Sequence, residues 1–244
     1  MLHLPPTRRL ELKLARRDCL SADESAALAE LAQEPFLKPA GAQLVEPGDR
    51  PDVSTLLLSG FAARYSELAD GRRQYTQINC PGDFVDLHSF VMRQMDHGVM
   101  CLSPCVVSAV PHDRLRRITQ DHPHLTRLLW LETVVDAAIH REWLLAMGQQ
   151  TALERLALFL CEMQARLDAV GLVENGVFDL PIRQQDLADF LGMSPVHLNR
   201  TLQILRETGW ISWKGAQVRV IDRQRLIEAA EFADTYLRLE RSPV

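Results

Sequence analysis

The stretch LGMSPVHLNR, at residues 191–200, decides how this chain is interpreted. Gly192 is placed to end one helix, and Ser194 with Pro195 is placed to begin the next, because serine caps helix N-termini and proline suits a first turn. The valine, histidine, asparagine and arginine that follow leave little apolar surface to bury. The stretch therefore predicts the turn and second helix of a helix-turn-helix, with Ala188 where the two helices cross closely.

The second helix of this motif has two unlike faces. At about 3.6 residues per turn, its inward face carries a mostly apolar set, namely Leu198, Thr201, Leu202 and Leu205. The outward face and its flank carry the side chains that we expect to read DNA bases, namely Val196, His197, Asn199, Arg200 and Gln203. Arginine bonds guanine, asparagine bonds adenine, and an apolar group contacts the thymine methyl. The alternative is the solvated polar face of an ordinary helical domain.

Residues around the motif are expected to contact DNA phosphates, namely Arg183, Gln184, Ser194 and Lys214. The first two lie at the start of the first helix, where backbone N–H groups also face outward. Lys214 precedes a glycine within GWISWKGAQVRVID, at 209–222, where apolar and polar residues alternate. That alternation predicts a two-stranded wing with the lysine at its tip.

The first half of the chain predicts short strands separated by turns, because glycines recur at hairpin spacing over residues 44–87. PGD occurs at 47–49 and again at 81–83, and proline followed by glycine predicts a type II turn. Asp70-Gly71 predicts a tight hairpin turn. Before the strands, Ser21 and Glu24 predict a capped helix. Cys101 and Cys105 would lie about 13 Å apart on a single strand, too far to share a metal.

Residues 123–147 predict one long helix, because Pro123 suits a first turn and no proline or glycine follows until Gly148. Its apolar residues recur at spacings of three and four, which permits a seam with a second copy of the chain. The residues expected in that dimer contact are Leu128, Leu131, Val135 and Ile139. Packing against its own domain alone is the alternative. The predicted domains are a sensor domain at 1–122, this helix, and a DNA-binding domain at 148–244.

Composition bounds the class of protein. The net charge of −5 shows no global excess of basic residues, although a local basic face can be hidden in such a sum. The 5 cysteines are scattered, and the N-terminus lacks a signal-peptide core, which predicts reduced thiols and a cytoplasmic location. No apolar run reaches the roughly 20 residues of a membrane span. We find no nucleophile–base arrangement and no phosphate-binding glycine loop, so we do not expect an enzyme.

The order of these parts resembles the cyclic-AMP receptor protein / fumarate–nitrate regulator (Crp/Fnr) family of bacterial transcription factors. The resemblance covers nearly the whole chain and is strongest in IRQQDLADFLGMSPVHLNRTLQILRETGWI, at 182–211, with PGDF at 81–84 in support. It implies an α+β fold with three parts: a cyclic-nucleotide-binding-like β-roll (double-stranded β-helix), a long dimerisation helix and a C-terminal winged helix-turn-helix. It also implies a homodimer that reads a two-fold symmetric site in double-stranded DNA, with RNA polymerase as a further partner.

Some residues depart from the family's pattern. Arg200 falls on the family's guanine-reading arginine, but Val196 stands where a glutamate usually accepts from cytosine, so we expect a different half-site. In the roll, Leu87 stands at the glutamate that holds ribose, and His97-Gly98 stand at the Arg-Ser pair that holds the cyclic phosphate. Cyclic AMP is therefore not expected, because its phosphate would lose a charge-assisted bond.

The effector stays open at this point. The residues expected around an effector pocket are Leu87, His88, His97 and Gly98. An iron–sulfur cluster is not expected, because Cys19 stands alone near the N-terminus. Haem or a soft metal is an alternative, suggested by a segment that contains His88, Met92, Met95, His97, Met100 and Cys101. Packing of these side chains within the roll is favoured instead. No metal site is predicted.

Two other functions are alternatives. One is a regulator whose DNA binding is controlled by haem or by a redox-active thiol. The other is a cupin-like metalloenzyme, for which His122 and His124 offer a ligand pair. That pair lies beside Pro123 at a helix start and has no strand scaffold, so the enzyme is the remoter alternative.

Overall fold

The computed structural model describes residues 5–243. Their helices are α1 (Arg8–Arg17), α2 (Ala22–Ala29), η1 (Leu87–Phe90), α3 (His112–Asp121), α4 (Pro123–Gln149), α5 (Ala152–Ala169), α6 (Gln184–Phe190), α7 (Pro195–Glu207), α8 (Arg223–Ala230) and η2 (Asp234–Leu237). Their strands are β1 (Phe36–Lys38), β2 (Gln43–Val45), β3 (Val53–Ser59), β4 (Ala62–Glu67), β5 (Arg73–Asn79), β6 (Gly98–Cys101), β7 (Cys105–Pro111), β8 (Val177–Asp179), β9 (Ile211–Lys214) and β10 (Gln217–Val220). This is the expected order of β-roll, long helix and winged helix.

The roll consists of two antiparallel sheets, of order β1-β7-β3 and β2-β6-β4-β5. Apolar side chains from both sheets fill the space between them, including Leu57, Val99 and Val107. Both PGD turns are confirmed as type II turns, because Gly48 and Gly82 have φ of +94° and +95° and the following aspartate N–H bonds a carbonyl three residues back.

The turn between β4 and β5 is wider than predicted. Strand β4 ends at Glu67 and β5 begins at Arg73, and the Leu68 N–H donates to the Arg72 carbonyl at 2.8 Å. Gly71 takes the left-handed conformation at φ +84°. The tight two-residue turn expected at Asp70-Gly71 is therefore wrong, since three residues separate the last bonded pair.

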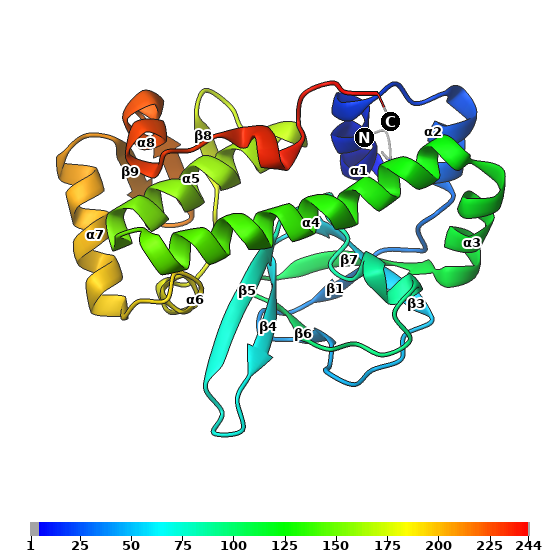
Figure 1. Cartoon of the computed structure of the whole chain (residues 1–244), viewed down its shortest axis with the longest axis horizontal. Coiled ribbons are helices and arrows are strands. Elements are labelled where there is room, and N and C mark those ends of the chain that lie inside the picture. Colours follow the sequence, from blue (N-terminus) through cyan, green and yellow to red (C-terminus); the bar gives the residue numbers. More distant parts are fainter. Residues whose placement is uncertain (1–4, 244) are drawn as a thin grey trace.

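Helix α4 is 27 residues long, with Pro123 in its first turn, and it runs across the molecule from α3 to the helix-turn-helix (Figure 1). Its first half packs on the N-terminal helices and the roll. There Glu132 forms ion pairs with Lys13 and Arg17 of α1. In its second half, the Trp143 ring lies 4.5 Å from the ring of Phe190. One helix therefore contributes to the cores of both domains.

A buried ion cluster joins the second PGD turn to the helices on either side. Asp83 accepts from Lys13 of α1 at 2.9 Å and from Arg166 of α5 at 2.6 Å. Burial alone would raise the pKa of Asp83, but the two cations hold it well below its usual value. The cluster fixes the turn between the N-terminal helix and the first helix of the C-terminal domain.

The C-terminal domain packs α5, α6, α7 and α8 against the sheet β8-β10-β9. Helix α5 is followed by Gly171 at φ +72°, which confirms the expected glycine at its C-terminal end. The capping box of Ser21 and Glu24 is also confirmed, because both of its hydrogen bonds are present.

Candidate functional site

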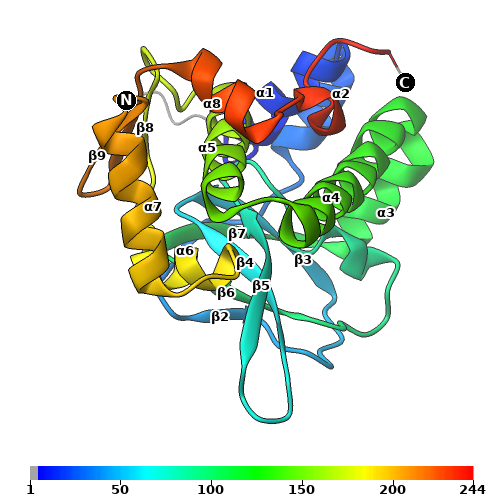
Figure 2. The ribbon, with the colours of Figure 1, turned by 60° about the vertical axis from the view of Figure 1, so that its left-hand side comes forward.

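The helix-turn-helix is formed by α6 and α7, and α7 lies at the outer edge of the molecule (Figure 2). Ala188 is fully buried where the two helices meet. Gly192 has φ +63° in the turn, and a Cβ there would lie 2.4 Å from Cε of Met147 on α4. Glycine is therefore needed for its backbone conformation and for close packing on the long helix.

Helix α7 is oriented by its cap and its apolar face. The Ser194 Oγ accepts from the His197 N–H at 3.2 Å. Leu198, Leu202 and Leu205 are buried against the domain core, with exposures of 0%, 1% and 0%. The opposite face must therefore point away from the protein.

The five side chains expected to read bases are all exposed, namely Val196, His197, Asn199, Arg200 and Gln203. Val196 is 64% exposed, although exposure of an apolar side chain to water is unfavourable. The amide side chains of Asn199 and Gln203 donate hydrogen bonds within the helix. Asn199 donates to the Pro195 carbonyl at 3.0 Å, and Gln203 donates to Glu207 Oε1 at 2.7 Å. Within residues 5–243, the Arg200 guanidinium has no hydrogen-bond or ion-pair partner.

The four residues expected at phosphates are also exposed, namely Arg183, Gln184, Ser194 and Lys214. Arg183 precedes α6 and is tied to Asp186 by bonds of 2.7 and 3.0 Å, yet its side chain is 72% exposed. Lys214 ends β9 just before Gly215, at the tip of the wing. The structure thus places these residues around α7 on separate elements.

Strand β5 of the roll contacts α6, a feature that the sequence did not reveal. The Tyr75 hydroxyl donates to Asp186 Oδ1 at 3.2 Å, and the Gln74 Nε2 donates to the carbonyls of Asp189 and Phe190 at 2.9 and 3.2 Å. Burial, together with Asp186, raises the pKa of Tyr75 to about 12. The roll therefore holds the first helix of the helix-turn-helix directly.

The residues of α4 expected at the dimer contact are not the exposed ones. Leu128, Val135 and Ile139 are buried within the same chain, and Leu131 is partly buried against its core. Exposed apolar residues form a different stripe, namely Trp130, Val134, Leu144 and Leu145. At 100° per residue the centre of this stripe lies about 150° from the centre of the buried set. The residues expected at the dimer contact are thus largely covered within the chain, and the exposed stripe is the side of α4 that the same chain leaves uncovered.

Two of the residues expected around an effector, His88 and His97, lie close to each other. Leu87 and His88 lie on η1, and His97 and Gly98 lie at the start of β6. The rings of His88 and His97 are 5.0 Å apart, and their Nε2 atoms are buried without a hydrogen-bond partner. Burial lowers the pKa of His88 to about 4, with Arg64 as a second cause, so this ring is neutral at physiological pH.

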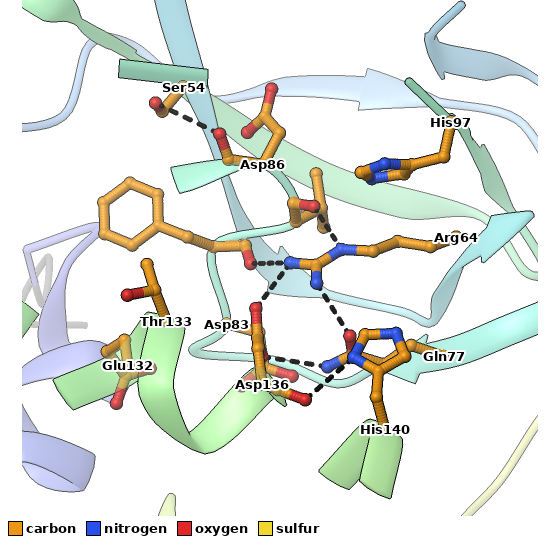
Figure 3. A network of polar contacts seen from close by, with 12 residues as sticks. Ser54, Arg64, Gln77, Asp83, Asp86, His97, Glu132, Thr133, Asp136 and His140 are labelled. Carbon is orange, nitrogen blue, oxygen red and sulfur yellow. Dashed lines mark hydrogen bonds and ion pairs between the residues drawn. The ribbon is translucent and has the colours of Figure 1, made fainter. Parts of the chain in front are cut away.

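Beside His97, Arg64 lies between the roll and α4 (Figure 3), and the sequence analysis did not single it out. Its guanidinium donates to the Val85 carbonyl, to Gln77 Oε1 and to Asp136 Oδ2 of α4, each at 2.7 Å. A fourth bond of 3.4 Å reaches the Phe84 carbonyl. This residue, Arg64, is 4% exposed and is thus already committed to partners within the chain.

Gly98 leaves no room for the family's phosphate-binding serine. A Cβ at this position would lie 2.3–2.5 Å from three atoms of the Tyr65 ring. Such distances are below any van der Waals contact, and the ring is itself buried. A side chain at residue 98 would require Tyr65 to move.

The metal alternatives gain no support from the arrangement of side chains. Across residues 5–243, no three or more His, Cys, Asp or Glu side chains gather to hold a metal ion. His124, half of the pair considered for a cupin-like site, instead contacts Glu24 at 2.7 Å and Asp18 at 3.1 Å. Within the same residues, none of the helices has the length and apolar character that a membrane crossing requires.

Comparison with known proteins agrees with this architecture. Residues 38–122 match the cyclic nucleotide-binding domain, and residues 154–229 match the Crp-like helix-turn-helix domain. The chain is 29% identical over 238 residues to FnrL, a transcriptional activator protein of Cereibacter sphaeroides, covering 94% of this chain and 95% of that one. It is 29% identical over 170 residues to the nitrogen fixation regulation protein FixK of Azorhizobium caulinodans, covering 70% and 67%.

Among solved structures, FixK2 from Bradyrhizobium japonicum superposes with a TM-score of 0.74 at 26% identity, covering 83% of this chain and 98% of that one. The relatives are transcription regulators rather than enzymes. With a roll, a long helix and a winged helix-turn-helix in this order, the chain belongs to the Crp/Fnr family of transcription regulators.

Proposed function

We propose that this regulator acts as a homodimer on a two-fold symmetric DNA site, with α7 of each subunit in the major groove. The observation that carries the proposal is the outward face of α7, where the Arg200 guanidinium is unpaired beside an exposed valine. That combination suits guanine and a thymine methyl. Arg183, Gln184, Ser194 and Lys214 would then contact phosphates on either side of the groove.

The dimer contact would use the exposed stripe of α4 rather than the buried set. Trp130 is 68% exposed and Leu144 is 76% exposed, and burial of such side chains in a second copy is favourable by about 1.5–3 kcal/mol each. Trp130→Asp with Leu144→Asp should convert the dimer into monomers in sedimentation equilibrium. Leu68→Asp, at a 58% exposed leucine off this helix, is the matched control and should leave the dimer intact.

The sensor domain would not bind cyclic AMP. Arg64 is held by partners within the chain, and Gly98 is closed off by Tyr65. A cyclic phosphate would thus find the Arg64 guanidinium already bonded and no serine hydroxyl at residue 98. Isothermal titration with cyclic AMP should show no heat of binding. Binding in the micromolar range would contradict this part of the proposal.

The division into 1–122, 123–147 and 148–244 is kept as the working division into domains, of which residues 1–4 and 244 lie outside those described. Since curated relatives are named transcriptional activators, we infer that this protein contacts RNA polymerase.

A regulator of this kind acts on the chromosome, in the cytoplasm.

The decisive experiment is selection of bound sites from random double-stranded DNA by the purified full chain, without added ligand. The expected result is an inverted repeat whose half-sites lie about one helical turn apart. Recovery of a single unrepeated site would contradict the dimer, and recovery of no sequence would contradict base reading by α7.

A further inference from the structure

Two cysteines lie at the corner where the chain passes from one sheet of the roll to the other. Cys101 ends β6 in the four-stranded sheet, and Cys105 begins β7 in the three-stranded sheet. Residues 102–104 turn the chain between them, so the separation of about 13 Å expected for one extended strand is wrong. Both side chains enter the same core between the sheets and are almost fully buried.

Both thiols lie in the same packed core and influence each other, which lowers the pKa of Cys105 and raises that of Cys101. The Cys105 Sγ is also hydrogen-bonded to the carbonyl oxygens of Phe61 and Ser103, at 3.2 and 3.3 Å. The corner is closed tightly over the pair, because a Cβ on Gly60 would lie 2.9 Å from the Cys105 Sγ and 2.3 Å from the Pro104 carbonyl oxygen. The Cys105 side chain is therefore packed closely at this corner.

The pair lies behind a weak edge of the roll. Cys105 is opposite Lys38 of β1, an edge strand of 3 residues. Its neighbour Leu37 is 70% exposed, and Pro104 in the corner is exposed. Short edge strands with few buried contacts open locally at much lower free energy than the whole domain. A small oxidant can therefore reach the sulfur atoms without global unfolding.

We propose that Cys101 and Cys105 form a reversible intrachain disulfide when the protein meets hydrogen peroxide. The Cys105 thiolate attacks one peroxide oxygen and breaks the O–O bond, which gives a sulfenic acid and, with one proton, water. The Cys101 sulfur then attacks the sulfenic sulfur and expels a second water. Two thiols and one peroxide thus give one disulfide and two waters, and an added dithiol reverses the change by exchange.

The other three cysteines serve as internal controls. Cys19 is exposed and Cys80 and Cys161 are buried, and burial raises the pKa of each of the last two to about 12. A single thiol without a second one beside it cannot close an intrachain bond, and a buried thiol of high pKa reacts slowly. The structure thus predicts a disulfide at one pair among the five cysteines.

The test is a peptide map of the native full-length protein after treatment with hydrogen peroxide. Remaining thiols are alkylated under denaturing conditions, and the protein is digested with trypsin without reduction. Residues 94–114 form one tryptic peptide, between Arg93 and Arg114, that contains Cys101 and Cys105 and no other cysteine. We expect this peptide to lose both alkylatable thiols and two hydrogen atoms, while Cys161 is alkylated as in untreated protein. Dithiothreitol should restore both thiols.

Variants confirm the assignment. Cys105→Ser should leave Cys101 alkylatable after the same treatment, and Cys161→Ser should leave the disulfide unchanged. Since the wild-type map needs no variant, the result stands even where a substitution disturbs the roll. The proposal is overturned when peptide 94–114 takes up two alkyl groups at a peroxide dose that already oxidises Cys19, or when its cysteines are found linked to another peptide.

Discussion

Arg64 and Arg200 lie in different domains and are used in opposite ways. Arg64 is buried between β4 and α4, where its guanidinium has four acceptors, one of them the Asp136 carboxylate. Arg200 is exposed on α7 and has no partner within the described residues. A buried cation needs its partners inside the chain, whereas an exposed unpaired one is free to bind a partner outside it.

The same contrast separates the two domains. In the roll, Arg64 and Gln77 are hydrogen-bonded to each other and to Asp136 of α4, so these polar groups tie the roll to the long helix. On α7, the two outward amide side chains of Asn199 and Gln203 are hydrogen-bonded within their own helix. Exposure without internal partners therefore distinguishes the binding surface from the structural polar cluster, although both contain arginine and amide groups.

The largest expected effect on stability comes from Arg64→Ala. Removal of the guanidinium leaves the Val85 carbonyl and Gln77 Oε1 without their donor, and Asp136 keeps only the Gln77 amide. Breaking a largely buried ion pair in this way costs about 3–5 kcal/mol. Urea unfolding followed by circular dichroism measures the loss. Arg200→Ala is the matched control and should change the unfolding free energy by less than about 0.5 kcal/mol. Similar stabilities for the two variants would remove the contrast drawn between them.

For DNA binding, we expect the larger effect from Arg200→Ala rather than from Arg64→Ala. Arg200→Ala should lose about 1–3 kcal/mol per half-site on the selected sequence, because a bidentate contact with guanine disappears. Affinity for random DNA should fall far less, since phosphate contacts remain. Fluorescence anisotropy with both DNAs measures the two affinities. A variant that still prefers the selected sequence as strongly as the wild type would refute base reading by this residue.

A smaller effect is expected where the two domains meet at the turn of the helix-turn-helix. Gly192→Ala should destabilise the protein by about 1–2 kcal/mol, because alanine tolerates positive φ poorly and its Cβ meets Met147. Gly209→Ala is the control, since Gly209 has φ +74° with nothing within 4 Å. The difference between the two unfolding free energies isolates the contact with α4. No difference would mean that Met147 moves aside freely.

The smallest effect concerns His124, at the start of α4. Hydrogen bonds with Asp18 and then with Glu24 raise its pKa above the usual 6.5. A raised pKa stabilises the fold fully below the unfolded-state value, and this contribution disappears as pH rises through the folded-state value. The side chain is 25% exposed, so solvent screening keeps the effect below about 1 kcal/mol. The stability advantage of wild type over His124→Gln should shrink between about pH 6 and 8; an advantage that grows over this range would contradict the assignment.

Much of this protein could be predicted from residues close together in the chain. Ser194 with Pro195 predicts where α7 begins, and Gly192 predicts the turn before it. The two PGD segments predict their type II turns, and Pro123 predicts the start of α4. These features depend on capping groups and on backbone conformations that proline and glycine determine locally. The outward face of α7 follows in the same way, because helical periodicity alone separates it from the buried leucines.

Other features were decided only by contacts between segments far apart in the sequence. The apolar residues of α4 occur on two sides, and only packing against the rest of the chain shows which side stays exposed. The local sequence around Arg64 does not reveal its role, because its partner Asp136 lies 72 residues later in the chain. The thiols of Cys101 and Cys105 lie in the same core because the chain changes sheets between them. Local sequence determines how a segment folds, but burial and pairing depend on which distant segment covers it.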